Sequence, residues 1–161
     1  MDKVKVLFVC LGNICRSPTA HGVFQHLVSE RGLSQQIEVD SAGTSDWHIG
    51  RSPDSRAQAA ALQRGCDLSA LSARQVSSAD FYDFDYILAM DNQNLQDLEQ
   101  VSPAGFSGYL ELFLPYGNIG EPREVPDPYY GGEQGFDQVL DMVELASTGL
   151  LNHICKRQGW S

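Results

Sequence analysis

A cysteine and an arginine near the start of the chain, Cys10 and Arg16, are separated by five residues. A thiolate is a strong nucleophile, and the planar guanidinium of arginine can bind two oxygens of one phosphoryl group, which lysine cannot do. The backbone amides between the two residues, with the N-terminus of a following helix, would form a binding site for an anion. In such surroundings Cys10 should be a thiolate at neutral pH. The pair therefore indicates nucleophilic chemistry on a bound phosphate group.

The residues on either side of this loop predict a strand before it and a helix after it. Residues 4–10 are almost all apolar and mostly β-branched, which is typical of a strand buried on both faces of a parallel sheet. Ser17 and Pro18 would supply an N-cap and a first-turn proline, and Gly32 would end the helix. Ligands of open parallel sheets bind beyond the carboxyl ends of the strands, so the loop lies where a ligand site is expected.

The rest of the chain alternates apolar strands with amphipathic helices. Further strands are expected at residues 37–41, 86–90 and 109–113. Further helices are expected to begin near residues 52–54 and 91–92, and a last helix carries an apolar face over residues 136–154. This alternation predicts one domain over residues 1–161, built on a single parallel sheet with right-handed crossovers.

Residues 115–135 are rich in proline and glycine and show no periodic pattern. An irregular segment of about twenty residues in a compact domain is usually functional or mobile. This segment contains Asp127 between two prolines, and an acid in that position can close over a bound ester. Phosphoryl transfer to a leaving oxygen benefits from such a positioned proton donor.

The composition restricts the possible partners. The chain of 161 residues has a net charge of −10, which argues against binding to nucleic acid or to an anionic membrane. No apolar run approaches the roughly 20 residues of a membrane span. The four cysteines have uneven spacings, which favours a reducing cytoplasm over a secreted disulfide framework. Residues 75–155 contain Arg123 as their one basic residue, so an anion site belongs in the first half or depends on backbone amides.

The segment 9–18, with the sequence VCLGNICRSP, closely resembles the signature of the low-molecular-weight protein tyrosine phosphatases. The resemblance extends over the whole chain. It includes DSAGT at residues 40–44, ARQ at 73–75, MD at 90–91 and VPDPY at 125–129.

The resemblance implies a fold and an activity. The fold is an open, twisted four-stranded parallel sheet with helices on both faces and a phosphate-binding loop after strand 1. The activity is hydrolysis of phosphotyrosine and aryl phosphate esters through a cysteinyl-phosphate intermediate, without metal or cofactor. Cys10 would attack phosphorus, Arg16 would bind the phosphoryl oxygens, and Asp127 would protonate the leaving phenol and then activate water. The expected partners are phosphotyrosine-containing proteins and phosphate- or vanadate-type inhibitors, and the expected state is a cytoplasmic monomer or weak homodimer.

The resemblance also implies supporting roles. Ser17 would stabilise the leaving thiolate, and Asn13 would hold the loop in shape, partly through Ser41. Cys15 could be a packing residue, but it is also the expected partner of an oxidised Cys10 in a reversible disulfide. The remaining predicted substrate contacts are Leu11, Gly12, Ile14 and Cys15 in the loop, and the aromatic walls Trp47, Tyr129 and Tyr130.

The chain departs from the family pattern at two positions. Many family members carry an acid in place of His21 and a histidine in place of Leu71. His21 and His48 do not belong to a set of residues with the spacing of a closed zinc site. Cys66 and Cys155 are expected to be core residues.

Two other functions must be weighed against a phosphatase. An arsenate reductase would need further redox cysteines near residues 80–90, and residues 77–91 contain none. A phosphotyrosine-binding module without activity would not need a general acid, yet Asp127 is present together with Cys10 and Arg16.

Overall fold

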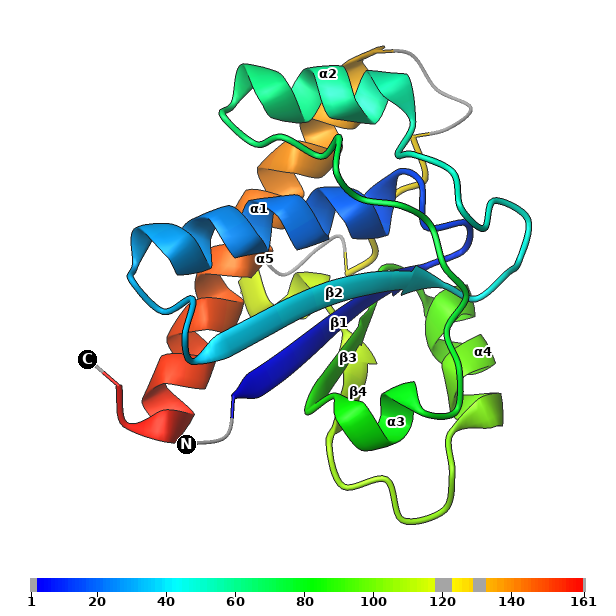
Figure 1. Cartoon of the computed structure of the whole chain (residues 1–161), viewed down its shortest axis with the longest axis vertical. Coiled ribbons are helices and arrows are strands. Elements are labelled where there is room, and N and C mark those ends of the chain that lie inside the picture. Colours follow the sequence, from blue (N-terminus) through cyan, green and yellow to red (C-terminus); the bar gives the residue numbers. More distant parts are fainter. Residues whose placement is uncertain (1–2, 118–122, 129–132, 161) are drawn as a thin grey trace.

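Four parallel strands form one sheet at the centre of the computed structural model, which describes residues 3–117, 123–128 and 133–160 (Figure 1). The strands are β1 (Val4–Cys10), β2 (Ile37–Gly43), β3 (Tyr86–Ala89) and β4 (Tyr109–Leu112), in the spatial order β2-β1-β3-β4. The predicted parallel sheet is confirmed. β2 runs two residues further than expected, and β3 and β4 each end one residue earlier.

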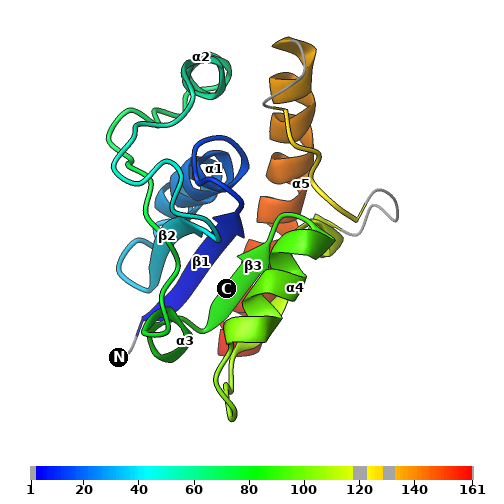
Figure 2. The same ribbon diagram turned by 90° about the vertical axis from the view of Figure 1, so that its right-hand side faces the viewer.

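Helices cover both faces of this sheet (Figure 2). They are α1 (Arg16–Glu30), α2 (Ser55–Gln63), α3 (Asp80–Asp83), α4 (Asn92–Val101) and α5 (Glu133–Gln158), with a 3-10 helix η1 (Leu114–Gly117). The sequence did not predict α3 and η1, because elements of four residues are too short to show a helical period. Within the described residues, no helix combines the length and the hydropathy that crossing a bilayer requires.

The sequence of β1 is almost entirely apolar because both faces of this central strand are buried. Val6 and Phe8 of β1 belong to a core shared with α1 and α5, whereas Leu7 and Val9 belong to a second core on the opposite face, shared with α3 and α4. Successive side chains of a strand point to opposite faces, so both sets are buried. Cys10 follows the first set and therefore points to the face that α1 and α5 cover.

The ends of the helices show which local signals decided them. Asp91 caps α4 through a reciprocal capping box with Asn94, and Asp54 caps α2 by accepting from Arg56 N. Gly32 follows α1 with a φ of 70°, as expected for a residue that ends a helix.

The predicted N-cap of α1 was wrong. The helix begins at Arg16 after Cys15, and no side chain caps it. Ser17 therefore lies inside the first turn, fully buried, where its hydroxyl is directed to Cys10 and to the carbonyl of Ala42. The Ser17 hydroxyl, which was predicted to cap α1, instead contacts the candidate nucleophile Cys10.

Candidate active site

The candidate nucleophile lies in a loop that joins the end of β1 to the start of α1. Backbone carbonyls of this loop accept hydrogen bonds from segments outside it, which fastens the loop to its surroundings. These bonds run from Thr44 N to Cys10 O at 2.9 Å, from Ser45 N to Leu11 O at 3.0 Å and from Asp54 N to Ile14 O at 2.7 Å. The first N–H groups of α1 have no acceptor within the helix, so its N-terminus favours a bound anion.

Two hydrogen-bond partners hold the Cys10 sulfur. Ser17 Oγ lies 3.0 Å from Cys10 Sγ, and Asn13 N donates to Sγ over 3.3 Å. Asn13 has a φ of 58°, the only positive value among the described residues other than glycine, and asparagine tolerates this conformation better than most residues. Donors in these positions stabilise a sulfur that carries negative charge.

The Asn13 side chain joins the loop to its neighbours. Its Nδ2 donates to Ser17 Oγ over 2.7 Å, and its Oδ1 accepts from Arg74 N over 3.0 Å. The expected support through Ser41 takes a different form, because Ser41 Oγ lies 2.9 Å from His21 Nδ1 and both polar atoms of the Asn13 amide are already bonded elsewhere. Ser41 is buried, and its side chain contacts α1 through His21.

Arg16 is held so that its guanidinium faces the loop. Its side chain is almost fully buried, and Nη1 donates to Asp91 Oδ2 over 2.6 Å and to the carbonyl of Val125 over 3.1 Å. Burial alone would lower the pKa of Arg16, but a negative Cys10 and the carboxylate of Asp91 together raise it above its ordinary value. The guanidinium therefore carries a permanent positive charge beside the sulfur.

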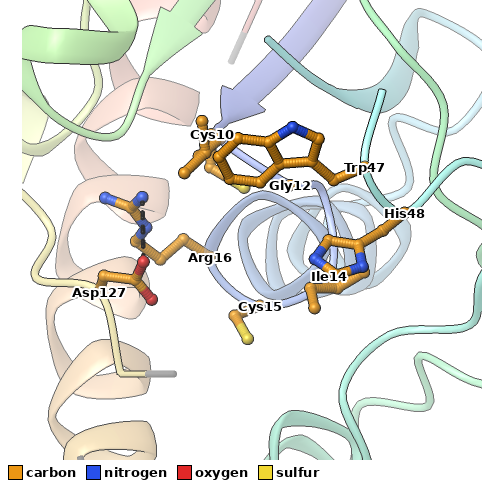
Figure 3. Close-up of a pocket in the computed structure, with 9 residues that line it drawn as sticks. Cys10, Gly12, Ile14, Cys15, Arg16, Trp47, His48 and Asp127 are labelled. Atoms are coloured by element: carbon orange, nitrogen blue, oxygen red, sulfur yellow. Dashed lines mark ion pairs between the residues drawn. The ribbon is translucent and has the colours of Figure 1, made fainter. Parts of the chain in front are cut away.

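A cavity of about 280 Å³ opens over the Cys10 sulfur (Figure 3). The loop contributes most of its lining, through Cys10, Leu11, Gly12, Ile14, Cys15 and Arg16, and the other lining residues are Trp47, His48 and Asp127. Trp47 is 67% exposed, and its position in the lining makes the face of its indole ring available to a bound ligand. The cavity thus has a charged end at Arg16 and apolar walls.

Asp127 reaches this cavity from the long segment before α5. Its carboxylate oxygen Oδ2 lies 3.7 Å from Arg16 Nη2, and its side chain is partly exposed (Figure 3). An acid in this place can exchange protons with solvent and with an ester oxygen bound at the mouth of the cavity. Tyr129 and Tyr130, the other predicted walls, lie outside the described residues.

The two cysteines of the loop have different surroundings. Cys15 is buried in a small cluster with Ala57 and Phe136. Burial, with smaller contributions from the negative charges of Asp54 and Cys10, raises the pKa of Cys15 to about 12. At neutral pH Cys15 is therefore a thiol. Cys10, in contrast, lines the cavity and has hydrogen-bond partners at its sulfur.

The departures from the family pattern fall side by side. His21 and Leu71 line the same surface hollow, beside the C-terminal part of α1. Burial lowers the pKa of His21, Arg74 lowers it further, and Asp40 opposes the shift. A neutral imidazole thus contacts Ser41 at the position where the resemblance implied an acid.

Three residues near the cavity were not found by sequence reasoning. Asp91 was placed at the start of a predicted helix and in a family motif, but its contact with Arg16 was not expected. His48 was considered only in connection with zinc, but it lines the cavity, and its Nδ1 is buried without a hydrogen-bond partner. Arg74 reaches Asn13 through its backbone, which side-chain chemistry cannot signal. Among the residues that the structure describes, no group of three or more acids, histidines or cysteines is placed to hold a metal ion.

Comparison with known proteins agrees with this geometry. The model of the family described as low molecular weight phosphotyrosine protein phosphatase matches residues 5–159. A putative low molecular weight protein-tyrosine-phosphatase of Synechocystis sp. is 44% identical, over 95% of this chain and 98% of that protein. A protein tyrosine phosphatase from Entamoeba histolytica, solved with Hepes in its active site, superimposes with a TM-score of 0.91 at 40% identity, covering 98% of this chain and 99% of that one.

A third relative carries a different name. The Drosophila arginine phosphatase superimposes with a TM-score of 0.88 at 39% identity, covering 94% of this chain and 98% of that one. The match of the family model over nearly the whole chain, the identity to named phosphatases and the shared fold all point the same way. This chain belongs to the low molecular weight phosphotyrosine protein phosphatase family.

Proposed function

We propose that this chain removes phosphate from phosphotyrosine in proteins, with Cys10 as nucleophile, Arg16 as the ligand of the phosphoryl oxygens and Asp127 as general acid and base. As a member of its family the chain is a phosphatase that acts on aryl phosphate esters through a cysteinyl-phosphate intermediate. One observation carries the assignment of roles: the sulfur of Cys10, the guanidinium of Arg16 and the carboxyl group of Asp127 line the same cavity.

The first half of the reaction forms the phosphoenzyme. The Cys10 thiolate attacks phosphorus, so that a P–S bond forms while the P–O bond to the phenol breaks. The proton of Asp127 passes to the departing phenol oxygen. The guanidinium of Arg16 and the loop amides bind the oxygens on which negative charge lies during the transfer, which is the main contribution that a protein can make to phosphoryl transfer.

The second half releases phosphate. Asp127, now a carboxylate, takes a proton from water as the water oxygen attacks phosphorus, and the P–S bond breaks. The departing sulfur recovers its negative charge and accepts hydrogen bonds from the hydroxyl of Ser17 and from Asn13 N–H, the contacts seen at 3.0 Å and 3.3 Å. Each turnover thus returns Asp127 to its protonated state and Cys10 to the thiolate.

The cavity walls support an aryl substrate. Leu11, Ile14 and Trp47 give the entrance an apolar lining, against which the face of a phenyl ring can pack. The Drosophila relative named as an arginine phosphatase makes phosphoarginine the alternative substrate to test. A guanidino group would lose its hydration against these apolar walls, so phosphotyrosine is favoured.

The experiment for the substrate compares three phosphopeptides of one sequence, carrying phosphotyrosine, phosphoarginine or phosphoserine, in the presence of a chelator. We expect kcat/KM for the phosphotyrosine peptide to exceed that of the other two by at least about a hundredfold, since a fitted pocket discriminates strongly between shapes. A higher value for phosphoarginine would assign the chain the activity named for its Drosophila relative.

The leaving group shows whether Asp127 acts as an acid. We expect Asp127→Asn to lower kcat/KM for phosphotyrosine or phenyl phosphate by about 10²–10⁴, the usual effect of a lost general acid. A substrate with a very acidic phenol should be affected much less, because its oxygen departs without a proton. The rate of the native enzyme should fall on the alkaline side of a mildly acidic optimum, and the variant should lose that alkaline limb. Steady-state kcat/KM against pH for both substrates measures this.

A role of Asp127 in bracing the loop would give a different pattern. All leaving groups would then slow by a similar factor, and the shape of the pH profile would be unchanged. Asp91 and Glu124 would become the next candidates for the acid. Both are engaged in the structure, Asp91 with Arg16 and Glu124 with the backbone N–H of Asn92, so they are suitable comparisons.

We also propose that the protein works in the cytoplasm, as one domain over residues 1–161 and as a monomer or weak homodimer. A reducing compartment keeps the Cys10 sulfur available, and all four cysteines are free thiols in the structure. Phosphate and vanadate should inhibit competitively, because the loop that binds the phosphoryl group also fits these oxyanions.

Mild oxidation should inactivate the enzyme reversibly. Peroxide converts the Cys10 thiolate to a sulfenic acid, and attack by Cys15 sulfur then releases water and forms a Cys10–Cys15 disulfide. Because Cys15 is a buried thiol, we expect this second step to be slow compared with the loss of activity. Peptide mapping after oxidation detects the Cys10–Cys15 disulfide, and the activity regained after treatment with dithiothreitol measures the recovery. Cys15→Ser should recover less activity than the native protein, and equal recovery would show that Cys15 does not protect Cys10.

A further inference from the structure

We propose that the ion pair between Arg74 and Asp80 positions the catalytic loop. The ion pair fixes the backbone N–H of Arg74, which orients the side-chain amide of Asn13. The Asn13 amide in turn orients the hydroxyl of Ser17 at the Cys10 sulfur. The inference rests on the proposed roles of Cys10 and Ser17. Arg74 and Asp80 do not line the cavity, so they act as positioning residues.

Arg74 and Asp80 form a two-point contact away from the substrate. Arg74 Nη1 donates to Asp80 Oδ2 over 3.0 Å and Nη2 donates to Asp80 Oδ1 over 3.1 Å. Asp80 is 95% buried, and it also accepts from Ser77 N over 2.8 Å. On its other side the guanidinium contacts Asp40 of β2, with Nε at 3.2 Å and Nη2 at 3.1 Å from Oδ2. Three nitrogen atoms of Arg74, Nε, Nη1 and Nη2, thus fix its segment to β2 and to the start of α3.

The same segment is bound to the end of β2. Gly43 N donates to Arg74 O and Val76 N donates to Gly43 O, each over 2.8 Å, which adds one parallel bridge beyond the strand. Gly43 in turn lies directly under the catalytic loop, since a Cβ placed on it would come within 2.7 Å of Leu11 O and 3.2 Å of Asn13 N. The backbone of Arg74 is therefore held at a fixed distance from the loop.

The orientation of the Asn13 amide follows from this arrangement. A backbone N–H can only donate, so the atom of Asn13 that faces Arg74 N must be the oxygen. The Asn13 Nδ2 group must then face Ser17 Oγ, to which it donates over 2.7 Å. Because Ser17 Oγ accepts there, its single proton remains free for the Cys10 sulfur at 3.0 Å or for the carbonyl of Ala42 at 3.3 Å. One backbone donor thus fixes the orientation of the Asn13 amide and leaves the Ser17 proton available to the nucleophile.

Stability is the obvious alternative role for an ion pair in which one partner, Asp80, is buried. Such pairs often contribute little net stability, because removing two charges from water costs as much as their attraction returns. A test must therefore separate positioning from folding. The distinguishing property is that positioning acts through Ser17, whereas a stabilising contact has no reason to do so.

The first measurement compares Arg74→Gln with a matched control, Arg64→Gln. Arg64 makes ion pairs with Asp137, Asp141 and Glu144 of α5 and does not line the cavity. We expect Arg74→Gln to lower kcat about tenfold, the effect of weakening one hydrogen bond to a charged group. The burst of phenol that reports phosphoenzyme formation should persist, because the variant weakens stabilisation of the thiolate that leaves in the second step, the release of phosphate. The pH at which iodoacetate alkylates Cys10 at half its maximal rate should move upward.

The second measurement repeats Arg74→Gln in the Ser17→Ala background. If Arg74 acts through Asn13 and Ser17, the tenfold loss should shrink to less than twofold there, because the bond that it sets no longer exists. Asp80→Asn keeps the shape of the side chain and tests the same pair should the glutamine variant not fold. Arg74→Lys, which keeps one contact, should recover part of kcat.

Two outcomes would overturn the proposal. The loss in kcat would be the same with and without Ser17, or Arg74→Gln would behave like Arg64→Gln, with a lower melting temperature and unchanged kcat and alkylation profile. Failure of the proposed function is distinguishable, because it would appear as turnover in Cys10→Ser regardless of Arg74.

Discussion

Cys10→Ser should abolish the hydrolysis of p-nitrophenyl phosphate while the protein remains folded and binds phosphate or vanadate. A serine hydroxyl at this position is not ionised at neutral pH, so the attacking anion is missing although the loop that binds the phosphoryl group is intact. The substituted oxygen can keep the contacts with Ser17 and Asn13, which preserves the loop. Turnover, the melting temperature and its increase with added vanadate measure the three parts of this prediction.

Cys155→Ser is the matched control for this variant. Cys155 is a free, partly buried thiol on α5 that does not line the cavity, so its loss should leave kcat unchanged. Appreciable turnover in Cys10→Ser, or a loss of activity in Cys155→Ser as large as that in Cys10→Ser, would show that the nucleophile has been wrongly assigned.

Arg16→Lys should lower kcat by about 10²–10³, the range found for other preorganised donors that stabilise developing negative charge. In the structure Nη1 of Arg16 is already bonded to Asp91 and Val125, whereas Nη2 lies 3.7 Å from Asp127, beyond hydrogen-bond distance, where it can bind a phosphoryl oxygen. A lysine ammonium is a single point charge and cannot serve the carboxylate of Asp91 and two phosphoryl oxygens at once. Steady-state kinetics with p-nitrophenyl phosphate measure the effect.

Arg31→Lys, at the other end of α1, controls for the chemical change itself. Arg31 is exposed and contacts Asn152 at 3.5 Å, so this variant should retain native kcat. Near-native kcat in Arg16→Lys would contradict the account, since it would mean that charge without the planar group is sufficient.

The sheet and its loop could be predicted from the sequence because their signals are local. The apolar run before Cys10 reflects a strand with both faces buried, and Asp54 and Asp91 cap the helices that they precede. The same rules failed at Ser17, where a residue type favoured at helix ends is instead turned inward to the nucleophile. At this position the tertiary contacts of the site, and not the local preference of serine for helix ends, determine where the side chain lies.

The resemblance implied the supporting roles of Ser17 and Asn13, but the contacts of Arg74 and Ser41 could not be predicted, because they join residues far apart in the chain. Asn13 and Arg74 are joined by a backbone donor, which any residue except proline could supply, so residue type carries no signal of the contact. The resemblance implied that Ser41 helps to support Asn13, but in this chain the Ser41 hydroxyl contacts His21.

The intermediate tests the central claim most directly. Asp127→Asn should slow the second step, so a denaturing quench during turnover of p-nitrophenyl phosphate should trap the phosphoenzyme. Mass spectrometry of the peptides should then find one phosphoryl group on the peptide that contains Cys10, attached to sulfur, and none in Cys10→Ser treated in the same way. Turnover that continues with no phosphoryl group on Cys10, or with the group on another residue such as Ser17, would contradict the account.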